Sequence, residues 1–333
     1  MTAIESPPTH AWPISLDDVE AARARIAPFL SPTPFREHPQ LAQLVGHDIR
    51  VFVKHENHQP TCSFKIRNGL SFMTALTEDE RRCGVVAAST GNHGQGIAYG
   101  AGLLGVSATI CVPRGNNPEK NAAMRALGAT VVEEGRDYDE AVVEMLRLAA
   151  HEGRVVAHST NDRRIVAGAA TMTLEILEQK PDLDALVIAV GGGSQAVGAM
   201  TVARALAPSL KVYGVQAAGA SAIHDSWHAH MRLTTNRADT FAEGVATRQT
   251  YDLTFPALQA GLAGFVTVTD SEIAESLRTL VSITHNLVEG AGAMGFAALP
   301  KLRKQLAGRR VGIIFCGGNI DTGTLRRILS KEM

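Results

Sequence analysis

The stretch Leu186-Val-Ile-Ala-Val190-Gly191-Gly192-Gly193-Ser194-Gln195 decides the fold prediction. An apolar run of strand length ends at three glycines, and an apolar helical pattern, 196–206, follows. Consecutive glycines let backbone N–H groups converge on one point, and the start of a helix adds the positive end of its dipole. The stretch therefore predicts a phosphate site. The alternative is a tight strand–helix turn, which rarely needs three glycines.

This glycine stretch differs from a nucleotide-binding P-loop. A P-loop has the pattern G-x-x-x-x-G-K-[ST], and both its lysine and its spacing are missing after Val190. We therefore expect a small phosphate monoester on a cofactor rather than ATP.

The alternation of strand and helix continues on both sides of this stretch. Short apolar runs without polar alternation are typical of strands buried on both faces, in parallel sheets covered by helices. The alternation predicts right-handed βαβ units and an α/β fold with open, mostly parallel sheets. The predicted strands are Val51–Lys54, Gly84–Ala88, Ala108–Val112, Ala129–Val132, Val155–Ala157, Leu186–Val190, Val212–Val215, Phe265–Val268 and Val311–Phe315.

Two helix starts and one irregular segment are also predicted. Ser15-Leu-Asp-Asp18 is a capping box, and Thr269-Asp-Ser-Glu272 opens a helix expected over Ile273–Val288. A further helical pattern covers 141–150, and the polar segment 224–254 is expected to be a loop-rich excursion.

The composition excludes several classes of protein. The chain has 333 residues, with 32 Lys and Arg against 33 Asp and Glu, so its net charge of −1 gives no basic surface for nucleic acid or an acidic membrane. Its apolar runs are far shorter than the roughly 20 residues of a membrane span. The four cysteines form no C-x-x-C pair, and Met1–Pro8 lacks an export pattern. We therefore expect a cytoplasmic protein.

A lysine in apolar surroundings provides the second chemical signal. In the stretch Thr61–Gly69, Lys65 is flanked by Phe64 and Ile66, with Cys62 nearby. Desolvation lowers the pKa of an amine and makes it a competent nucleophile and base. The alternative is an ordinary surface lysine, which is the commoner case. Together with a phosphate site, however, a nucleophilic lysine is what pyridoxal phosphate requires.

The stretch Ser89-Thr90-Gly91-Asn92-His93-Gly94-Gln95-Gly96 follows a predicted strand and opens a helix. Small hydroxyls and free amides at the start of a helix suit a carboxylate. The amide of Asn92 can also donate to a phenolic oxygen. The alternative is a helix cap, which would explain one hydroxyl residue but not the whole run.

Two glycine-containing motifs near the C-terminus complete the set. Phe315-Cys316-Gly317-Gly318-Asn319 ends a strand, where Cys316 would offer a weak S–H donor or would simply be a buried thiol. Glu289-Gly-Ala-Gly-Ala-Met-Gly295 matches G-x-G-x-x-G, but it follows a helix and lacks the acidic residue about 20 positions on that a dinucleotide site needs. Close helix packing explains its glycines and leaves Glu289 as a candidate functional acid.

Two histidine groups are candidates for a metal site. His55 and His58, and His224, His228 and His230, have no carboxylate in register with them, and solvated histidines are the commoner outcome. We therefore expect no metal.

Taken in order, the motifs around Lys65, Asn92, the 191–195 loop, Glu289 and Cys316 resemble the fold-type II pyridoxal-phosphate enzymes of the threonine/serine dehydratase and serine racemase family. This resemblance implies pyridoxal 5'-phosphate as cofactor and a tryptophan synthase β-like fold with two twisted sheets. It also implies a small α/β domain, 50–150, a large cofactor-binding domain formed by 1–49 and 151–333, and a homodimer.

The resemblance also assigns roles to individual residues. Lys65 would be the Schiff-base lysine, and Thr90 the second catalytic residue, where serine racemases have a serine. The residues that would hold the cofactor are Phe64, Lys65, Asn92, Gly191, Gly192, Gly193, Ser194, Gln195, Glu289 and Cys316. The residues that would hold the substrate are Ser89, Thr90, Gly91 and His93.

The implied activity is β-elimination of a 3-hydroxy amino acid, such as threonine, serine or the bulkier phenylserine, to a 2-oxo acid and ammonia. A thiol at Cys316 favours elimination because it cannot keep the ring nitrogen protonated as a carboxylate would. The alternatives are a serine-racemase-like racemase, a 3-hydroxyaspartate dehydratase, and a phosphate-binding protein in which Lys65 is idle.

The chain also departs from the family pattern. Cys62 and Asn68 replace glycines that flank the lysine motif in relatives. Relatives with a divalent-cation site have an acidic residue after the strand that ends near Val215, where this chain has Gln216, Ala220 and Ala222. This second departure also argues against a metal.

Overall fold

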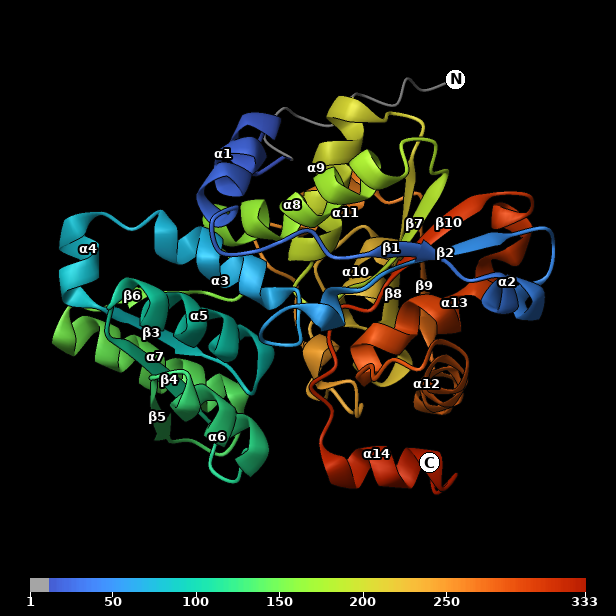
Figure 1. Ribbon diagram of the computed structural model, residues 1–333. Coiled ribbons are helices and arrows are strands. Elements are labelled where there is room, and N and C mark those ends of the chain that lie inside the picture. Colours follow the sequence, from blue (N-terminus) through green and yellow to red (C-terminus); the bar gives the residue numbers. More distant parts are fainter. Residues whose placement is uncertain (1–11) are drawn as a thin grey trace.

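Two sheets organise residues 12–333, the part of the chain that the computed structural model describes (Figure 1). The larger sheet has six strands in the order β1-β2-β10-β7-β8-β9, and the smaller has four in the order β5-β4-β3-β6. All neighbouring strands described here pair in parallel, except that β1 runs antiparallel to β2. The predicted α/β fold with two mostly parallel sheets is confirmed.

Every predicted strand is present, within two residues at each end. The larger sheet consists of β1 (Phe35–Glu37), β2 (Arg50–Lys54), β7 (Ala185–Ala189), β8 (Lys211–Ala217), β9 (Gly264–Val268) and β10 (Arg310–Ile314). The smaller consists of β3 (Val85–Ala88), β4 (Ala108–Val112), β5 (Thr130–Glu133) and β6 (Val155–Val156). All residues of β3 and β4 are buried, as continuous apolar runs predict. The prediction missed β1, a short edge strand without an apolar run.

Helices cover both sheets (Figure 1). They are α1 (Leu16–Ile26), α2 (Pro39–Val45), α3 (Lys65–Thr74), α4 (Glu78–Cys83), α5 (Asn92–Leu104), α6 (Pro118–Ala126), α7 (Tyr138–Glu152), α8 (Arg163–Gln179), α9 (Ser194–Leu206), α10 (Ala222–Ala229), α11 (Phe255–Gly261), α12 (Asp270–Thr284), α13 (Gly290–Leu306) and α14 (Thr322–Leu329). Within residues 12–333, the 3₁₀ turns are η2 (Glu56–His58), η3 (Ala218–Ala220) and η4 (Glu243–Val245).

The predicted helix starts are confirmed, but two boundaries differ. Ser15 and Thr269 both close capping boxes. The helix expected to reach Val288 ends at Thr284, because His285 takes a left-handed conformation with φ of 53°. The expected excursion 224–254 begins with the end of α10 and becomes irregular only after it, with η4 inside.

Sheet membership suggests different limits for the predicted small domain. The strand β2 pairs with β10 in the larger sheet, although the prediction placed residue 50 in the small domain. The strand β6 pairs with β3 in the smaller sheet, although it lies beyond residue 150. Pairing with β10 depends on a segment some 260 residues away in sequence, which local patterns do not reveal. The division into two domains stays a prediction, and we propose limits near residues 55 and 157.

The helix α3 lies between elements of both sheets, and glycines make this possible. A Cβ on Gly69 would lie 2.2 Å from the Gly96 carbonyl oxygen in α5. A Cβ on Gly168 in α8 would lie 2.5 Å from the Arg67 carbonyl oxygen in α3. The backbone of α3 therefore touches α5 on one side and α8 on the other. This packing fixes the start of α3, which is Lys65.

No helix within residues 12–333 combines the length and apolar character that crossing a membrane requires. The segment Met1–Pro8, used above for the export argument, lies outside the described residues.

Candidate active site

Lys65 begins α3 and points to the loop that follows β6. Its Nζ donates to the Ser159 carbonyl oxygen at 3.4 Å and lies 5.3 Å from the centroid of the Phe64 ring. Burial lowers the pKa of Lys65 to about 8, and the nearby Cys316 and Glu289 oppose this shift. A partly buried amine with one long hydrogen bond is available for covalent chemistry.

A pH dependence follows from this pKa. Because the neutral amine is the nucleophile, we expect the rate at which cofactor-free protein takes up pyridoxal phosphate to rise about tenfold per pH unit below about 8 and then to level off. Stopped-flow absorbance measures this rate. A rise that continues to pH 10.5, the ordinary lysine value, would contradict the lowered pKa.

The predicted phosphate loop lies beside the same segment. A Cβ on Gly192 would lie 1.9 Å from Thr160 Oγ1. Thr160 directly follows Ser159, whose carbonyl oxygen accepts the hydrogen bond from Lys65. The Thr254 hydroxyl donates to the Gly192 carbonyl oxygen at 2.6 Å. The next residue, Gly193, has φ of +93°, which glycine adopts at no steric cost. The glycines therefore form a close-fitting turn at the start of α9, near the amine of Lys65.

Gly192→Ala is expected to weaken pyridoxal phosphate binding by at least about tenfold, because the added methyl collides with Thr160 and shifts the turn. Titration of the cofactor-free protein, followed by absorbance, measures the affinity. The control is Gly102→Ala in α5, where the added Cβ meets the Leu127 carbonyl oxygen at 3.1 Å and no cofactor contact is predicted. Equal affinities in both variants would contradict the assignment of this loop.

The Cys316 motif lies against the lysine motif. The Phe64 N–H donates to the Cys316 carbonyl oxygen at 2.9 Å, and Ser63 forms an isolated bridge with Gly317. Burial raises the pKa of the Cys316 thiol well above its ordinary value. The group is therefore a neutral thiol, as the prediction for a partner of the ring nitrogen requires.

A chain of amides fixes the orientation of Asn92 at the start of α5. Its Nδ2 donates to Glu289 Oε1 at 2.7 Å, and its Oδ1 accepts from Asn319 Nδ2, also at 2.7 Å. Asn319 Nδ2 donates in addition to the Thr61 carbonyl oxygen at 2.9 Å. One N–H of Asn92 is left for another acceptor, which agrees with the predicted contact to a phenolic oxygen. The sequence motif that contains Asn319 does not by itself predict this role.

Glu289 is buried at the centre of this group. Burial raises the pKa of its carboxyl, while Lys120 and Asn92 act in the opposite direction. A Cβ on Gly317 would lie 2.3 Å from Glu289 Oε1, so only glycine lets the carboxylate approach this loop. The other glycines after Glu289 serve packing: a Cβ on Gly295 would lie 3.2 Å from Ile313 Cβ in β10. Gly290 lies close to Phe241 and Ala242, and Gly292 lies close to the Gly317 carbonyl oxygen, so the G-x-G-x-x-G pattern serves the close packing of α13, as the packing interpretation predicts.

The predicted carboxylate loop is partly engaged with itself. The Ser89 hydroxyl accepts from the N–H groups of Gly91 and Gly94 at 3.1 and 2.9 Å, so it caps the start of α5. The donors left for a carboxylate are the hydroxyls of Ser89 and Thr90, since Ser89 only accepts in these two bonds, and free N–H groups at the first turn of the helix. Contact between Ser89 or Thr90 and substrate stays a prediction.

His93 is buried, and its ring bonds to a carbonyl oxygen outside this loop. Its Nε2 donates to the Ala157 carbonyl oxygen at 2.8 Å, and burial lowers its pKa to about 3. The imidazole is therefore neutral and positions α5 against β6. A substrate contact for His93 stays a prediction, with its backbone N–H as the available group.

The two departures from glycine have different structural consequences. Cys62 has φ of 51°, in the left-handed region that favours glycine, so glycine suits this position in relatives. Asn68 lies in α3 with its side chain fully buried, and no partner for either polar atom is present among residues 12–333.

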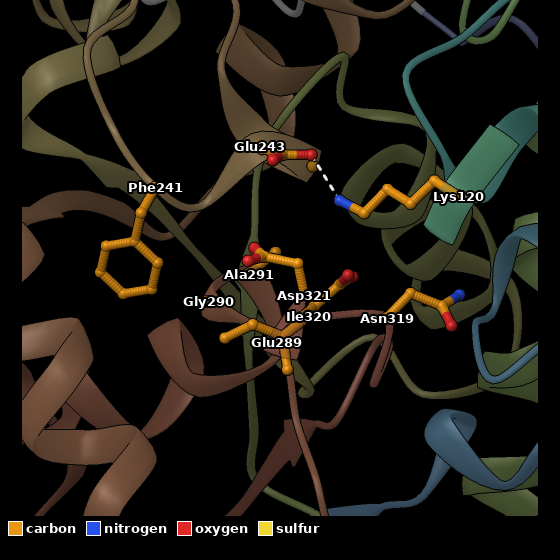
Figure 2. A pocket seen from close by; sticks show the side chains of 10 residues that line it. Lys120, Phe241, Glu243, Glu289, Gly290, Ala291, Asn319, Ile320 and Asp321 are labelled. Atoms are coloured by element: carbon orange, nitrogen blue, oxygen red, sulfur yellow. Dashed lines mark hydrogen bonds and ion pairs between the residues drawn. The ribbon is translucent and has the colours of Figure 1, made fainter. Parts of the chain in front are cut away.

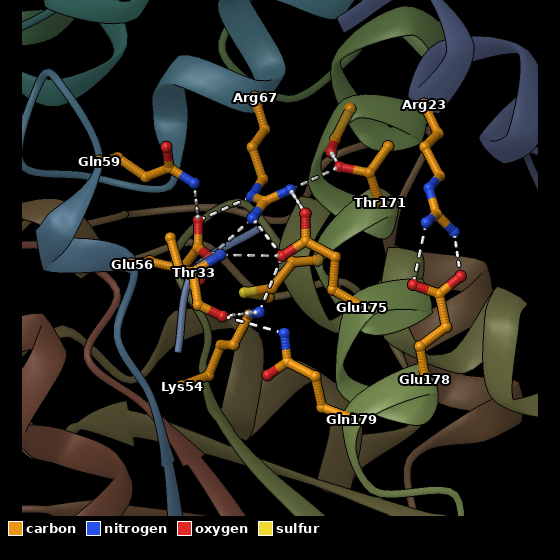
Figure 3. Close-up of polar contacts among 12 residues, drawn as sticks. Arg23, Thr33, Lys54, Glu56, Gln59, Arg67, Thr171, Glu175, Glu178 and Gln179 are labelled. Carbon is orange, nitrogen blue, oxygen red and sulfur yellow. Dashed lines mark hydrogen bonds and ion pairs between the residues drawn. The ribbon is translucent and has the colours of Figure 1, made fainter. Parts of the chain in front are cut away.

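A buried ionic cluster connects α3 to the larger sheet (Figure 3). Arg67 donates to Glu56 through Nε and NH2 at 2.7 and 2.9 Å, and to both oxygens of Glu175 at 2.7 Å. Lys54 Nζ donates to Glu175 and to the Thr33 carbonyl oxygen, both at 2.8 Å. The charges of the two cations and two carboxylates balance, and one member, Arg67, lies two residues beyond Lys65 in α3. No local sequence pattern predicts this cluster.

Further residues near the site were also missed: Ser159, Thr160, Thr254, Lys120 and Glu243. Thr160 follows a predicted strand, β6, so a search of that strand end would have found it. Thr254 and Glu243 lie in the irregular segment, where no local pattern points to the site. Among residues 12–333, no three His, Cys, Asp or Glu side chains are placed to hold a metal ion.

The residues gathered here fit pyridoxal phosphate. The lysine amine is available, and the glycine turn cannot accommodate a side chain on Gly191 or Gly192, whose added Cβ atoms would lie within 2.6 Å of other atoms. Asn92 has a free donor, and Cys316 is a neutral thiol. These groups match the aldehyde, phosphate, phenolic oxygen and ring nitrogen of the cofactor.

Comparison with known proteins agrees with this fit. The curated relatives include a protein of Thermotoga maritima named L-threonine ammonia-lyase, 37% identical over 96% of this chain and 79% of that protein. They also include a catabolic L-threonine dehydratase of Staphylococcus aureus, 33% identical over 92% of this chain and 90% of that protein.

Solved structures give the same picture. Maize serine racemase has a TM-score of 0.90 at 29% identity, covering 96% of this chain and 98% of that chain. Threonine deaminase isoform 2 from Solanum lycopersicum has a TM-score of 0.89 at 30% identity, covering 95% of this chain and 91% of that chain. Residues 26–317 match the family model described as pyridoxal-phosphate dependent enzyme. This match and the similarity to these structures show that the chain belongs to this family of pyridoxal-phosphate dependent enzymes, in its fold-type II branch.

Proposed function

We propose that the protein is a lyase that converts a 3-hydroxy amino acid of the threonine and serine type into a 2-oxo acid and ammonia. The observation that carries this proposal is the neutral thiol of Cys316, next to the segment that presents Lys65. A thiol with a raised pKa leaves the ring nitrogen unprotonated, which favours loss of a β-substituent over transamination. The names of the relatives from Thermotoga maritima and Staphylococcus aureus support the same reaction.

Each group of the site has a proposed role. The turn Gly191–Gln195 holds the phosphate, and Asn92 donates to the phenolic oxygen with its orientation fixed by Glu289 and Asn319. The start of α5, with Thr90, holds the substrate carboxylate, because free N–H groups and the helix dipole favour an anion there. Phe64 packs on the cofactor ring.

Lys65 is the proposed base. Pyridoxal phosphate, when bound, draws electrons away from Cα of the amino acid joined to it. The neutral amine of Lys65 then removes the α-proton, and the bond from Cβ to its hydroxyl breaks. The α-proton and the hydroxyl together leave as water. The enamine released to solvent hydrolyses to the 2-oxo acid and ammonia.

Racemisation is the second candidate, because serine racemase of maize has a similar structure. It needs a second acid on the face of the substrate opposite Lys65. Thr90 is the candidate for that acid, and its methyl group crowds this face compared with a serine. We therefore favour the lyase.

The test incubates the holoenzyme with L-threonine, L-serine, phenylserine and 3-hydroxyaspartate separately. Release of 2-oxo acid is followed with a coupled dehydrogenase, and chiral chromatography measures the enantiomers. The proposal expects 2-oxo acid from at least one of these compounds and little of the opposite enantiomer. The opposite enantiomer as main product would establish a racemase, and no reaction with any of them would contradict both activities.

A further inference from the structure

Lys120 and Glu243 form an ion pair between α6, which lies beside the smaller sheet, and η4, which packs against α13 of the larger unit (Figure 2). Lys120 lies in the first turn of α6, which packs beside β5 of the smaller sheet, and Glu243 begins η4. The Lys120 side chain is 12% exposed and that of Glu243 is 46% exposed. The ammonium group is therefore held inside, and the carboxylate that neutralises it reaches the surface.

Both partners border the groups that the proposed function uses. The stem of Lys120 lies against Gly91 of the carboxylate loop, where an added Cβ would be 3.0 Å from Lys120 Cδ. The Gly244 carbonyl oxygen, next to Glu243, would be 2.6 Å from a Cβ on Gly191 of the phosphate loop. The pair therefore connects the two loops that enclose the predicted place of the amino acid.

The charges around this pair are mostly negative. Lys120 lines an opening together with the carboxylates of Glu243, Glu289 and Asp321, and it is the one cation among the lining residues (Figure 2). Lys65, the other nearby amine, is committed to the cofactor in the proposed mechanism. The uncharged lining residues are Phe241, Gly244, Gly290, Ala291, Asn319 and Ile320. A second carboxylate on a ligand would thus find no unneutralised cation in this lining.

We propose that the Lys120–Glu243 pair determines which side-chain charge the site accepts, selecting amino acids with an uncharged side chain against those with an acidic one. This inference rests on the proposed function for the class of ligand, a free amino acid. It narrows the substrates to 3-hydroxy amino acids with an uncharged side chain and argues against 3-hydroxyaspartate.

The physical cause is competition for one ammonium group. An acidic side chain gains Lys120 only by displacing Glu243, and it then lies near Glu289 and Asp321, whose charges repel it. An uncharged side chain leaves the ion pair intact. Removal of the Glu243 charge frees Lys120, so the same position then attracts a carboxylate.

The test compares the binding of L-aspartate and L-asparagine, which have nearly the same shape and differ in side-chain charge. Neither has a β-hydroxyl, so binding to the holoenzyme is read from the change in the visible absorbance of its cofactor. The quantity of interest is the ratio of the two dissociation constants. The wild-type holoenzyme is expected to bind L-aspartate at least about tenfold more weakly than L-asparagine.

Three variants and a control test the cause. Glu243→Gln is expected to lower the ratio by about tenfold or more, and Glu243→Asp, which keeps the charge, to leave it close to wild type. The improved binding of L-aspartate relative to L-asparagine in Glu243→Gln is expected to disappear when Lys120→Met is added, because the freed ammonium group is then missing. The control is Glu144→Gln, which breaks an ion pair with Arg147 on α7 and should leave the ratio unchanged.

Two results would overturn the proposal: a wild-type holoenzyme that binds L-aspartate as well as L-asparagine, or a ratio in Glu243→Gln within twofold of wild type. Uniform weakening of both ligands in Glu243→Gln leaves the ratio unchanged and counts against charge selection. Release of 2-oxo acid from L-serine is measured in parallel. No release from L-serine or from any of L-threonine, phenylserine and 3-hydroxyaspartate, with the expected shift in ratio, would contradict the lyase proposal while supporting the role of the ion pair.

Discussion

Lys65→Ala is expected to lower kcat/KM for 2-oxo acid formation by at least about a thousandfold, because general-base catalysis alone contributes roughly 10²–10⁴ and covalent attachment of the cofactor is lost as well. The structure supports this expectation through the partial burial of Lys65 and its pKa of about 8. Steady-state kinetics with the substrate that the wild-type enzyme prefers measures the loss.

Two controls separate chemistry from charge and from folding. Lys65→Arg keeps a positive charge at the start of α3 but cannot react with an aldehyde, so it should be as inactive as Lys65→Ala. Lys301→Ala removes a surface amine that pairs with Glu272 and should retain nearly full activity. Activity of Lys65→Ala within tenfold of wild type would mean that Lys65 is idle and would favour the phosphate-binding alternative.

Arg67→Met is expected to lower the free energy of unfolding by about 3–5 kcal/mol, the range for breaking a buried ion pair by removing one partner. Arg67 is 1% exposed and bonds to both Glu56 and Glu175. Although burial opposes ionisation, Arg67 and Lys54 hold the pKa of Glu56 below its ordinary value. The substitution leaves two buried carboxylates beside the single cation Lys54.

The matched control is Arg23→Met, which breaks a bidentate pair with Glu178 on the outer side of α8 (Figure 3). The side chains of Arg23 and Glu178 are both substantially exposed, so Arg23→Met is expected to lower the free energy of unfolding by only about 0–1 kcal/mol. Urea denaturation of both holoenzyme variants gives the comparison. A similar loss in the free energy of unfolding in the two variants would contradict a structural role for the buried cluster. An active-site consequence of Arg67→Met should appear as weaker cofactor binding, because α3 also presents Lys65.

The strands and the main site motifs could be predicted because their signals are local. A strand buried on both faces requires a continuous apolar run, so β3, β4 and β7 are visible in the sequence alone. A phosphate turn such as Gly191–Gly193 requires small residues between strand and helix. The limits of such local reading appear at β1, a partly exposed edge strand without an apolar run.

The remaining features depend on residues far apart in sequence. Glu56, Arg67 and Glu175 read separately as surface charges, and only the packing of α3 against α8 makes them one buried cluster. Likewise, Asn319 lies 227 positions from Asn92, which it orients. No local pattern connects such pairs. The ion pair of Lys120 with Glu243 is equally non-local, since it joins elements associated with different sheets.

The most direct test of the account is to reduce the holoenzyme with borohydride, which fixes the cofactor permanently to the amine that holds it, and to locate the modified lysine by mass spectrometry of peptides. The account predicts that the pyridoxyl group is found on Lys65, in the peptide that begins α3. Its presence on another lysine, such as Lys54 or Lys120, with Lys65 unmodified would contradict the account.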